Sequence, residues 1–216
     1  MAPSLRSLVK NALFDHIPGL LRRGPTSAKR VALTFDDGPD AMTHAYLDLL
    51  DQLAAPATFF VVGKHVEVHP ELVSEYVRRG HQIAGHGYDH TRFTKLSRAQ
   101  LLEQCSRTER VLGDGRGSRP WVRPPYGALD AKSLISLRAA GYIVALWSID
   151  PEDYTEKDPK TLADRCAPGA VNGGDVLLFH EGQQWTLDAL PAIVGGLRAA
   201  GFELVTMRDL VEPRRM

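Results

Sequence analysis

Short apolar segments alternate with amphipathic segments from residue 31 onward, and this alternation constrains the fold more than any other feature. The short segments are rich in β-branched and other apolar residues, which is typical of strands, and they cover 31–35, 58–62, 82–84, 121–122, 142–147, 176–179 and 203–205. The segments between them have helical periodicity and cover 41–53, 70–79, 97–112, 130–140, 160–166 and 186–200. About seven strands that alternate with helices predict an α/β fold with a parallel sheet, either an open doubly wound sheet or a barrel.

The composition is that of an ordinary globular domain. Of the 216 residues, 44% are hydrophobic and 24% are charged, which argues against disorder and against a membrane bundle. The 26 basic and 26 acidic side chains cancel, so no overall field attracts nucleic acid. Two cysteines, Cys105 and Cys166, are too few for a disulfide framework. The absence of a long linker predicts one domain over 31–216.

Residues 1–30 carry an apolar stripe with helical spacing. The stripe predicts an amphipathic helical segment that packs on the domain, and the alternative is docking on a membrane surface beside Arg22 and Arg23. It consists of Leu5, Leu8, Val9, Ala12, Leu13, Ile17, Leu20 and Leu21. No run approaches the roughly 18 apolar residues of a transmembrane helix, and charged residues interrupt any signal-peptide core. We therefore expect no transmembrane segment and a cytoplasmic location.

Two carboxylates follow the first predicted strand directly. Asp36 and Asp37 stand before Gly38-Pro39, at the strand end where active groups gather in both candidate architectures. Burying adjacent carboxylates is costly unless a cation neutralises one of them, and the other is then free to act as a base. The alternative is a turn that caps the next helix.

Two histidines follow the third predicted strand at a spacing of four. His86 and His90 can converge on one ion, and the neighbouring glycines let the backbone bend. A second pair, His65 and His69, precedes Pro70, which disfavours a helical face, and we interpret that pair as surface or capping residues. One Asp with two His predicts a catalytic metal site with open positions, for which zinc is the default and other divalent transition metals remain possible.

Three further strands end in polar residues. Arg123-Pro-Pro-Tyr126 follows the fourth strand, and its two prolines predict a stiff loop. Asp150-Pro-Glu-Asp153-Tyr154 follows the strand that ends at Trp147. His180 ends the Val176–Phe179 strand, and its position at the same edge favours a functional interpretation over a core histidine.

These five segments, in this order, resemble the motifs of the polysaccharide deacetylase family, the NodB-homology domain of carbohydrate esterase family 4. The resemblance extends from residue 31 to about residue 210. It implies a distorted, incomplete (β/α) barrel and a metal-dependent hydrolase that removes N-acetyl groups from N-acetylated amino sugars. Two positions depart from the family pattern, because Gly87 stands where Ser or Thr is usual and Tyr154 stands where Trp is usual.

The resemblance also implies a role for each residue. Asp37, His86 and His90 would bind one divalent metal ion, and Asp36 would be the general base, held by Arg123. The backbone N–H of Tyr126 would stabilise the oxyanion, and His180, steadied by Asp153 or Asp150, would protonate the amine. Tyr154, Pro125 and Leu178 would line the substrate groove.

Two alternatives remain at this point. The same family contains amidohydrolases that act on cyclic imides and ureides, which would keep the fold but change the substrate. A catalytically silent carbohydrate-binding protein is the other, and only Gly87 and Tyr154 favour it. Two-metal phosphoesterase chemistry is disfavoured, since the ligand set is too small.

Overall fold

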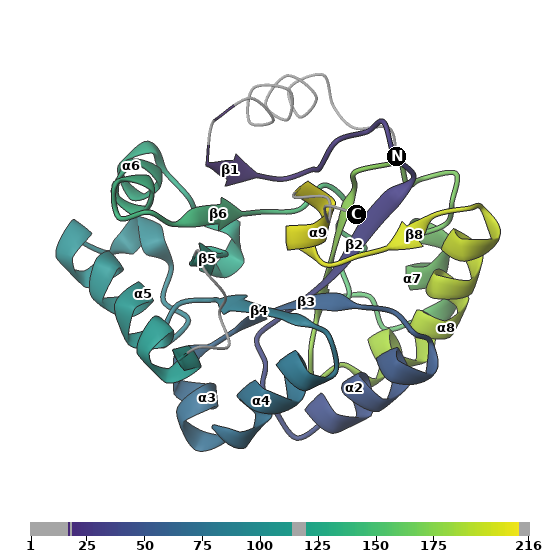
Figure 1. Cartoon of the computed structure of the whole chain (residues 1–216), viewed down its shortest axis with the longest axis horizontal. Coiled ribbons are helices and arrows are strands. Elements are labelled where there is room, and N and C mark those ends of the chain that lie inside the picture. Colours follow the sequence, from purple (N-terminus) through teal and green to yellow (C-terminus); the bar gives the residue numbers. More distant parts are fainter. Residues whose placement is uncertain (1–16, 18, 114–119, 212–216) are drawn as a thin grey trace.

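The computed structural model describes residue 17, residues 19–113 and residues 120–211 (Figure 1). Its eight strands in these ranges all pair in parallel, in the order β1-β6-β5-β4-β3-β2-β7, while β8 pairs with the beginning of β2. The strands are β1 (Leu20–Leu21), β2 (Arg30–Asp36), β3 (Ala57–Val61), β4 (Gln82–Gly85), β5 (Trp121–Val122), β6 (Ile143–Ala145), β7 (Val176–His180) and β8 (Glu203–Leu204). All seven predicted strands are present.

The sheet curls into a barrel that does not close. Beyond β6, the chain approaches β7, where Ile149 and Leu177 form an isolated parallel bridge and the Leu178 amide donates to the Ile149 carbonyl at 3.0 Å. No continuous ladder joins β6 to β7 in the described ranges. The prediction of a distorted, incomplete (β/α) barrel is therefore confirmed, and the open doubly wound alternative is wrong.

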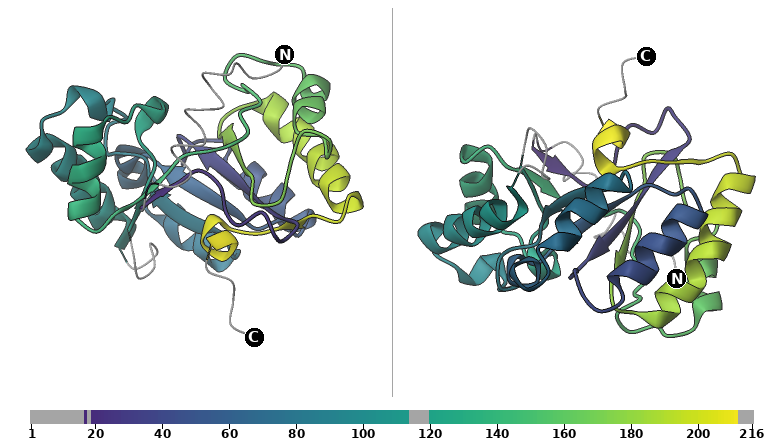
Figure 2. Two further views of the ribbon diagram at one scale, coloured as in Figure 1. Left: turned by 90° about the horizontal axis from the view of Figure 1, so that it is seen from above. Right: turned by 60° about the horizontal axis from the view of Figure 1, so that its bottom comes forward.

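Helices surround this sheet on its outer side (Figures 1 and 2). The outer helices are α2 (Thr43–Gln52), α3 (Gly63–Val68), α4 (Glu71–Arg78), α5 (Arg98–Leu112), α6 (Ala131–Ala139), α7 (Pro159–Arg165) and α8 (Gln184–Ala199), and the 3-10 turns are η1 (Phe93–Lys95) and η3 (Pro125–Gly127). The short helix α9 (Met207–Val211) instead packs on the inner side of the sheet, where the Met207 amide donates to Thr58 Oγ1. The helix α5 begins with a capping box, because Ser97 accepts from the Gln100 amide and the Gln100 side chain accepts from the Ser97 amide. The sequence pattern missed α3 and α9, which are too short to show a helical period.

The end of the predicted N-terminal helical segment forms a strand. Residues 1–16 and 18 lie outside the described residues, but Leu20 and Leu21 form β1 beside β6. The Val144 amide donates to the Gly19 carbonyl, and the Leu146 amide donates to the Leu21 carbonyl. Without β1, one edge of β6 would leave these backbone groups unpaired, so pairing across the fold overrides the helical spacing.

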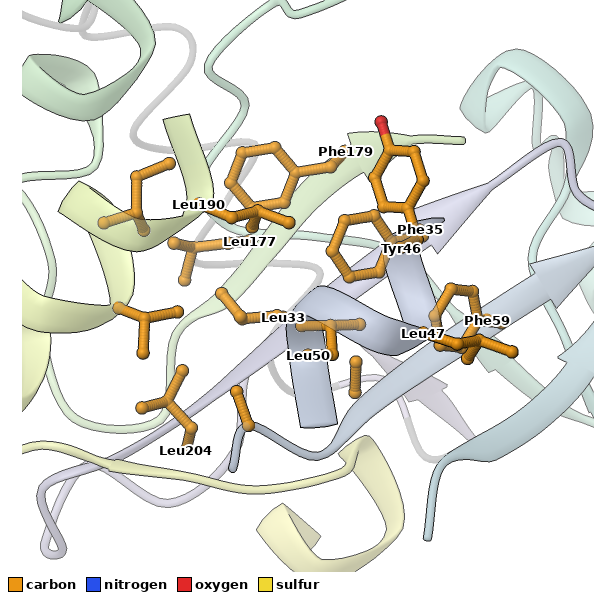
Figure 3. Close-up of a cluster of buried hydrophobic side chains, with 14 of the residues drawn as sticks. Leu33, Phe35, Tyr46, Leu47, Leu50, Phe59, Leu177, Phe179, Leu190 and Leu204 are labelled. Atoms are coloured by element: carbon orange, nitrogen blue, oxygen red, sulfur yellow. The ribbon is translucent and has the colours of Figure 1, made fainter. Parts of the chain in front are cut away.

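Aromatic side chains fix the register of the central strands (Figure 3). The fully buried ring of Phe35 stacks on Phe59 and Phe179, with ring centroids 5.1 and 5.7 Å apart, and meets Tyr46 of α2 edge-on at 5.4 Å. Such rings supply a large share of the burial free energy of a core. This packing aligns β2 with β3 and β7, so that the next residue, Asp36, lies directly beside His180 of β7.

The structure also describes the two cysteines and the helices that were examined as membrane spans. Cys105 and Cys166 are both buried as free thiols. Among the residues that the structure describes, no helix combines the length and the apolar character needed to cross a membrane.

Candidate active site

A cavity of about 330 Å³ lies where the central strands end. Its walls come from β2 and β7, from the segments after β2, β4 and β5, and from the segment that follows β6. The lining residues are Asp36, Asp37, His86, His90, Arg92, Tyr126, Trp147, Tyr154, Leu178 and His180. Eight of these ten are residues that the sequence singled out, so the carboxyl-end rule for parallel strands located the cavity.

Three of the lining residues form a cluster with the geometry of a metal site. Ligand atoms of Asp37, His86 and His90 lie within 4.8 Å of one another, and it is the one group of this kind in the described ranges. Asp37 Oδ1 lies 3.1 Å from His90 Nε2 and 3.6 Å from His86 Nε2. Burial raises the pKa of Asp37, but the contact with His90 and the charges of His86 and His180 outweigh burial and lower the pKa to about 2. The carboxylate is therefore ionised.

The cluster fits a cation on two further observations. The Oδ1 atom of Asp37 is buried, and no donor with hydrogen-bonding geometry satisfies it within the described chain. His86 Nδ1 lies 2.9 Å from the Arg123 carbonyl, which can only accept, so Nδ1 carries the hydrogen. Burial lowers the pKa of His86, and its other ring nitrogen, Nε2, faces Asp37. An outward Nδ1–H bond of this kind orients histidine ligands in metal sites.

Backbone strain is concentrated in the same loops. Among the described residues, five that are not glycine have a positive φ, and three of them line the cavity: Asp37 (76°), His90 (61°) and Tyr126 (60°). Such conformations cost free energy and persist where the surrounding structure enforces them, which is common at functional sites. Here they point the side chains of Asp37 and His90 toward each other.

A buried ion pair lies beside the cluster. Arg123 and Asp36 are 0% and 3% exposed, and an NH1 hydrogen of Arg123 is donated to Asp36 Oδ1 at 2.6 Å. The same guanidinium donates to Thr34 Oγ1 and to the Leu146 carbonyl, and it faces the Phe60 ring. An ion pair that is buried and hydrogen-bonded in this way holds the Asp36 carboxyl group in one orientation.

A second ion pair closes the other side of the cavity. His180 Nδ1 lies 2.7 Å from Asp153 Oδ1, while Asp153 Oδ2 accepts from the His180 amide and from Thr186 Oγ1. Burial lowers the pKa of His180, but Asp153, followed by the charges of Asp36 and Asp37, raises it to about 9. The imidazole is therefore protonated at neutral pH, and it is oriented by a fully buried carboxylate.

The structure shows which of Asp150 and Asp153 pairs with His180, a choice that the sequence did not decide. Asp153 contacts His180, whereas Asp150 is exposed and accepts from the Glu152 amide at 2.9 Å. Tyr154 and Leu178 line the cavity as expected, and the Tyr154 ring meets His180 edge-on at 5.5 Å. Pro125 is buried and is not among the lining residues, so its expected place in the substrate groove is not supported.

Sequence reasoning missed two lining residues, and the signals for them differ. Trp147 ends a predicted strand, so the rule that located the other residues also applies to it. Arg92 follows the second histidine by two positions and stacks on Tyr126 at 3.9 Å, and no pattern in the sequence marks it.

Two residues that support the site from behind were also missed. His65, interpreted as a surface or capping residue, is half-buried, and its Nδ1 lies 2.8 Å from the Asp37 carbonyl. Glu181 is buried, where its carboxyl group accepts from Thr43 Oγ1 and Tyr76 Oη, and burial raises its pKa to about 8. Its amide donates to the Asp36 carbonyl, so the residue after His180 also holds the first carboxylate loop.

Gly87, one of the two departures from the family pattern, has a local structural reason. Its φ is +74°, a region that side chains rarely adopt, and a Cβ there would lie 3.3 Å from the Phe93 ring. The backbone of this chain therefore favours glycine beside the first histidine.

Comparisons with known proteins agree with this geometry. A family model described as Polysaccharide deacetylase matches residues 23–145. The peptidoglycan-N-acetylmuramic acid deacetylase PdaC of Bacillus subtilis (strain 168) is 35% identical over 189 residues, which cover 87% of this chain and 40% of PdaC. The chitooligosaccharide deacetylase of Sinorhizobium fredii (strain NBRC 101917 / NGR234) is 30% identical over 205 residues, which cover 88% of this chain and 94% of that protein.

A solved structure is similar over nearly the whole chain. The Bc1960 peptidoglycan N-acetylglucosamine deacetylase, crystallised with 4-naphthalen-1-yl-N-oxidanyl-benzamide, superposes with a TM-score of 0.85 at 31% identity. The match covers 91% of this chain and 94% of that one. The chain spans about two fifths of the length of PdaC, so it corresponds to one part of that longer protein. On the family match, the sequence identities and the shared fold, this chain belongs to the polysaccharide deacetylase family.

Proposed function

We propose that this chain is a metal-dependent hydrolase that removes N-acetyl groups from N-acetylated amino sugars in oligosaccharides or polysaccharides. The observation that carries the proposal is the convergence of three units on one cavity. These units are the ligand cluster of Asp37, His86 and His90, the Asp36–Arg123 pair, and the Asp153–His180 pair. Amide hydrolysis needs an activated nucleophile, a stabilised oxyanion and a proton for the amine, and each unit fits one of these needs.

Asp37, His86 and His90 would hold one divalent ion. One carboxylate and two imidazoles leave open positions for water and substrate, and they suit zinc best, with other divalent transition metals as alternatives. When bound, such an ion polarises the acetyl carbonyl and lowers the pKa of a water molecule toward about 7.

Asp36 would act as the general base. Its Oδ1 is engaged by Arg123, while its Oδ2 lies 3.6 Å from His86 Nε2, on the side of the ligand cluster. This leaves Oδ2 to accept a proton from the attacking water. Arg123 holds Asp36 in place through this hydrogen bond, and it is a positioning residue because it lies beneath the cavity and does not line it.

His180 would act as the general acid. Asp153 binds Nδ1, so Nε2 carries the proton that is given to the departing amine. The backbone N–H of Tyr126, held in a strained turn at the cavity wall, would donate to the oxyanion. Trp147 and Tyr154 supply aromatic faces of the kind that stack on sugar rings, and Leu178 adds an apolar surface.

The substrate class follows from the relatives. PdaC is named for N-acetylmuramic acid in peptidoglycan, and the Sinorhizobium fredii protein is named for chitooligosaccharides. The neutral net charge of this chain is compatible with a glycan and gives no overall attraction for nucleic acid.

Acetate release from a panel of substrates tests this proposal. The panel contains N-acetylglucosamine oligomers, N-acetylmuramic-acid glycans and cyclic imides, each assayed with and without a chelator. We expect acetate from at least one glycan, loss of that activity with the chelator, and recovery when Zn²⁺ is added back. Imide hydrolysis without acetate would replace the proposal by the amidohydrolase alternative. Sugar binding without any hydrolysis would replace it by the silent relative.

A further inference from the structure

Arg92 places a positive charge on the cavity wall that the chemistry described above does not use. Its guanidinium lies 3.9 Å from the centre of the Tyr126 ring, and that ring is 4.5 Å from the His90 ring. All three side chains line the cavity. A continuous stack therefore leads from a ligand of the proposed metal ion to a guanidinium at the exposed end of the wall.

This charge has no carboxylate partner, in contrast to the other charges of the cavity. Asp36 is paired with Arg123, His180 is paired with Asp153, and Asp37 faces two imidazoles. Within the ranges that the structure describes, no ion pair involves Arg92, and the interaction of its guanidinium there is the contact with the Tyr126 ring. The guanidinium thus keeps its fork of N–H donors, which matches a carboxylate.

We propose that Arg92, supported by the Tyr126 ring, forms a subsite for a carboxylate that the sugar carries close to its acetamido group. The inference rests on the proposed function and deepens it by naming a substrate class. This class is the N-acetyl amino sugars whose neighbouring ring carbon bears a substituent with a carboxylate, as in the lactyl ether of N-acetylmuramic acid. Elsewhere in the cavity, Trp147, Tyr154 and Leu178 carry no formal charge, and the His180 cation is already paired with Asp153. A carboxylate is therefore favoured on the Arg92 side, which fixes the orientation of the ring.

Two glycans that differ only in charge provide the test. One is an oligomer with alternating N-acetylglucosamine and N-acetylmuramic acid, and the other is the same oligomer with each lactyl carboxylate converted to a primary carboxamide. For the unchanged protein we expect kcat/KM for acetate release to be about tenfold higher on the acid, as for one hydrogen-bonded charge at a partly exposed site. The preference should fall as salt is added.

Substitutions separate recognition of charge from support of the Tyr126 ring. Arg92→Gln should lower the ratio of kcat/KM between the acid and the amide to about one, while Arg92→Lys should keep part of the preference for the acid. Arg98→Gln is the matched control, because it removes an exposed arginine at the start of α5 that does not line the cavity. The control should keep the full preference.

Three results would overturn the inference. They are equal rates on acid and amide in the unchanged protein, an equal loss on both glycans in Arg92→Gln, and loss of the preference in Arg98→Gln. Calorimetric binding of the same two glycans gives the ratio even if no acetate is released. Tighter binding of the acid without turnover would contradict the proposed function and support the subsite. Turnover of both glycans at equal rates would support the proposed function and contradict the subsite.

Discussion

Replacing Asp153 by Asn should move the pH dependence of the enzyme and not only its rate. Asp153 Oδ1 contacts His180 Nδ1, while Oδ2 accepts from the His180 amide and from Thr186 Oγ1. An asparagine side chain can keep its oxygen toward the latter two donors, so the fold around the histidine is preserved. The negative charge opposite the imidazole is lost.

The expected size of the effect follows from the pKa of His180. Burial lowers this pKa from 6.5, and Asp153 is the leading group that raises it to about 9. Without the charge of Asp153, the pKa should fall toward 6.5 or below. At pH 8 the protonated fraction of His180 would then decrease from roughly 90% to roughly 3%. Since a general acid must carry its proton, activity is present below the pKa and is lost as the pH rises through it.

The assay is kcat/KM for acetate release between pH 5.5 and 9.5. The unchanged protein should lose activity near pH 9, and Asp153→Asn should lose it about 2.5 pH units lower, with a much smaller difference near pH 5.5. Asp150→Asn is the control and should leave the alkaline limb in place, because Asp150 makes no hydrogen bond to His180. A uniform loss at every pH in Asp153→Asn would refute the reasoning, since it would indicate a purely structural role.

Three further substitutions test the framework around the site by denaturant unfolding. Gly38→Ala would drive its Cβ into the buried Glu181 carboxyl group, so we expect a loss of about 1–3 kcal/mol, and unchanged stability would contradict the packing. Phe35→Ala empties the centre of the core and should cost about 3–5 kcal/mol, and a cost below about 1 kcal/mol would indicate a loosely packed core. Arg123→Met leaves the buried Asp36 carboxylate without its charged partner and should lower the free energy of unfolding by about 3–5 kcal/mol. An unchanged free energy of unfolding would mean that this ion pair is not buried.

Much of this architecture could be predicted from the sequence because its determinants are local. The buried strands β2, β3 and β7 are nearly uninterrupted apolar runs, and β2 and β7 end directly in polar residues. The carboxyl ends of parallel strands meet at one edge, so Asp36, His86 and His180 could be placed together before any coordinates were known.

The remaining features depend on contacts between distant parts of the chain. Leu20 and Leu21 belong to an apolar pattern with helical spacing, yet they pair with the edge of β6 as a strand. Asp150 and Asp153 are nearly equivalent in sequence, but Glu152, with a φ of +62°, turns the loop so that only Asp153 reaches His180.

At the site itself, the roles of Arg92 and Glu181 also depend on contacts with distant parts of the chain. Arg92 resembles any surface arginine until the Tyr126 loop, 34 residues further along the chain, is placed against it. Glu181 is a charged residue at a strand end, and only the fold buries it between Thr43 and Tyr76. Neither the contact of Arg92 with Tyr126 nor the burial of Glu181 can be predicted from the sequence of this chain alone.

Metal content and acetate release, measured on the same preparations, test the central claim most directly. The unchanged protein should bind one divalent ion per chain and release acetate from an N-acetylated glycan. Asp37→Ala should lose both the ion and the activity, whereas His180→Ala should keep the ion and lose turnover by about 10²-fold or more. Full activity in Asp37→Ala without bound metal, or near-normal kcat in His180→Ala, would contradict the account.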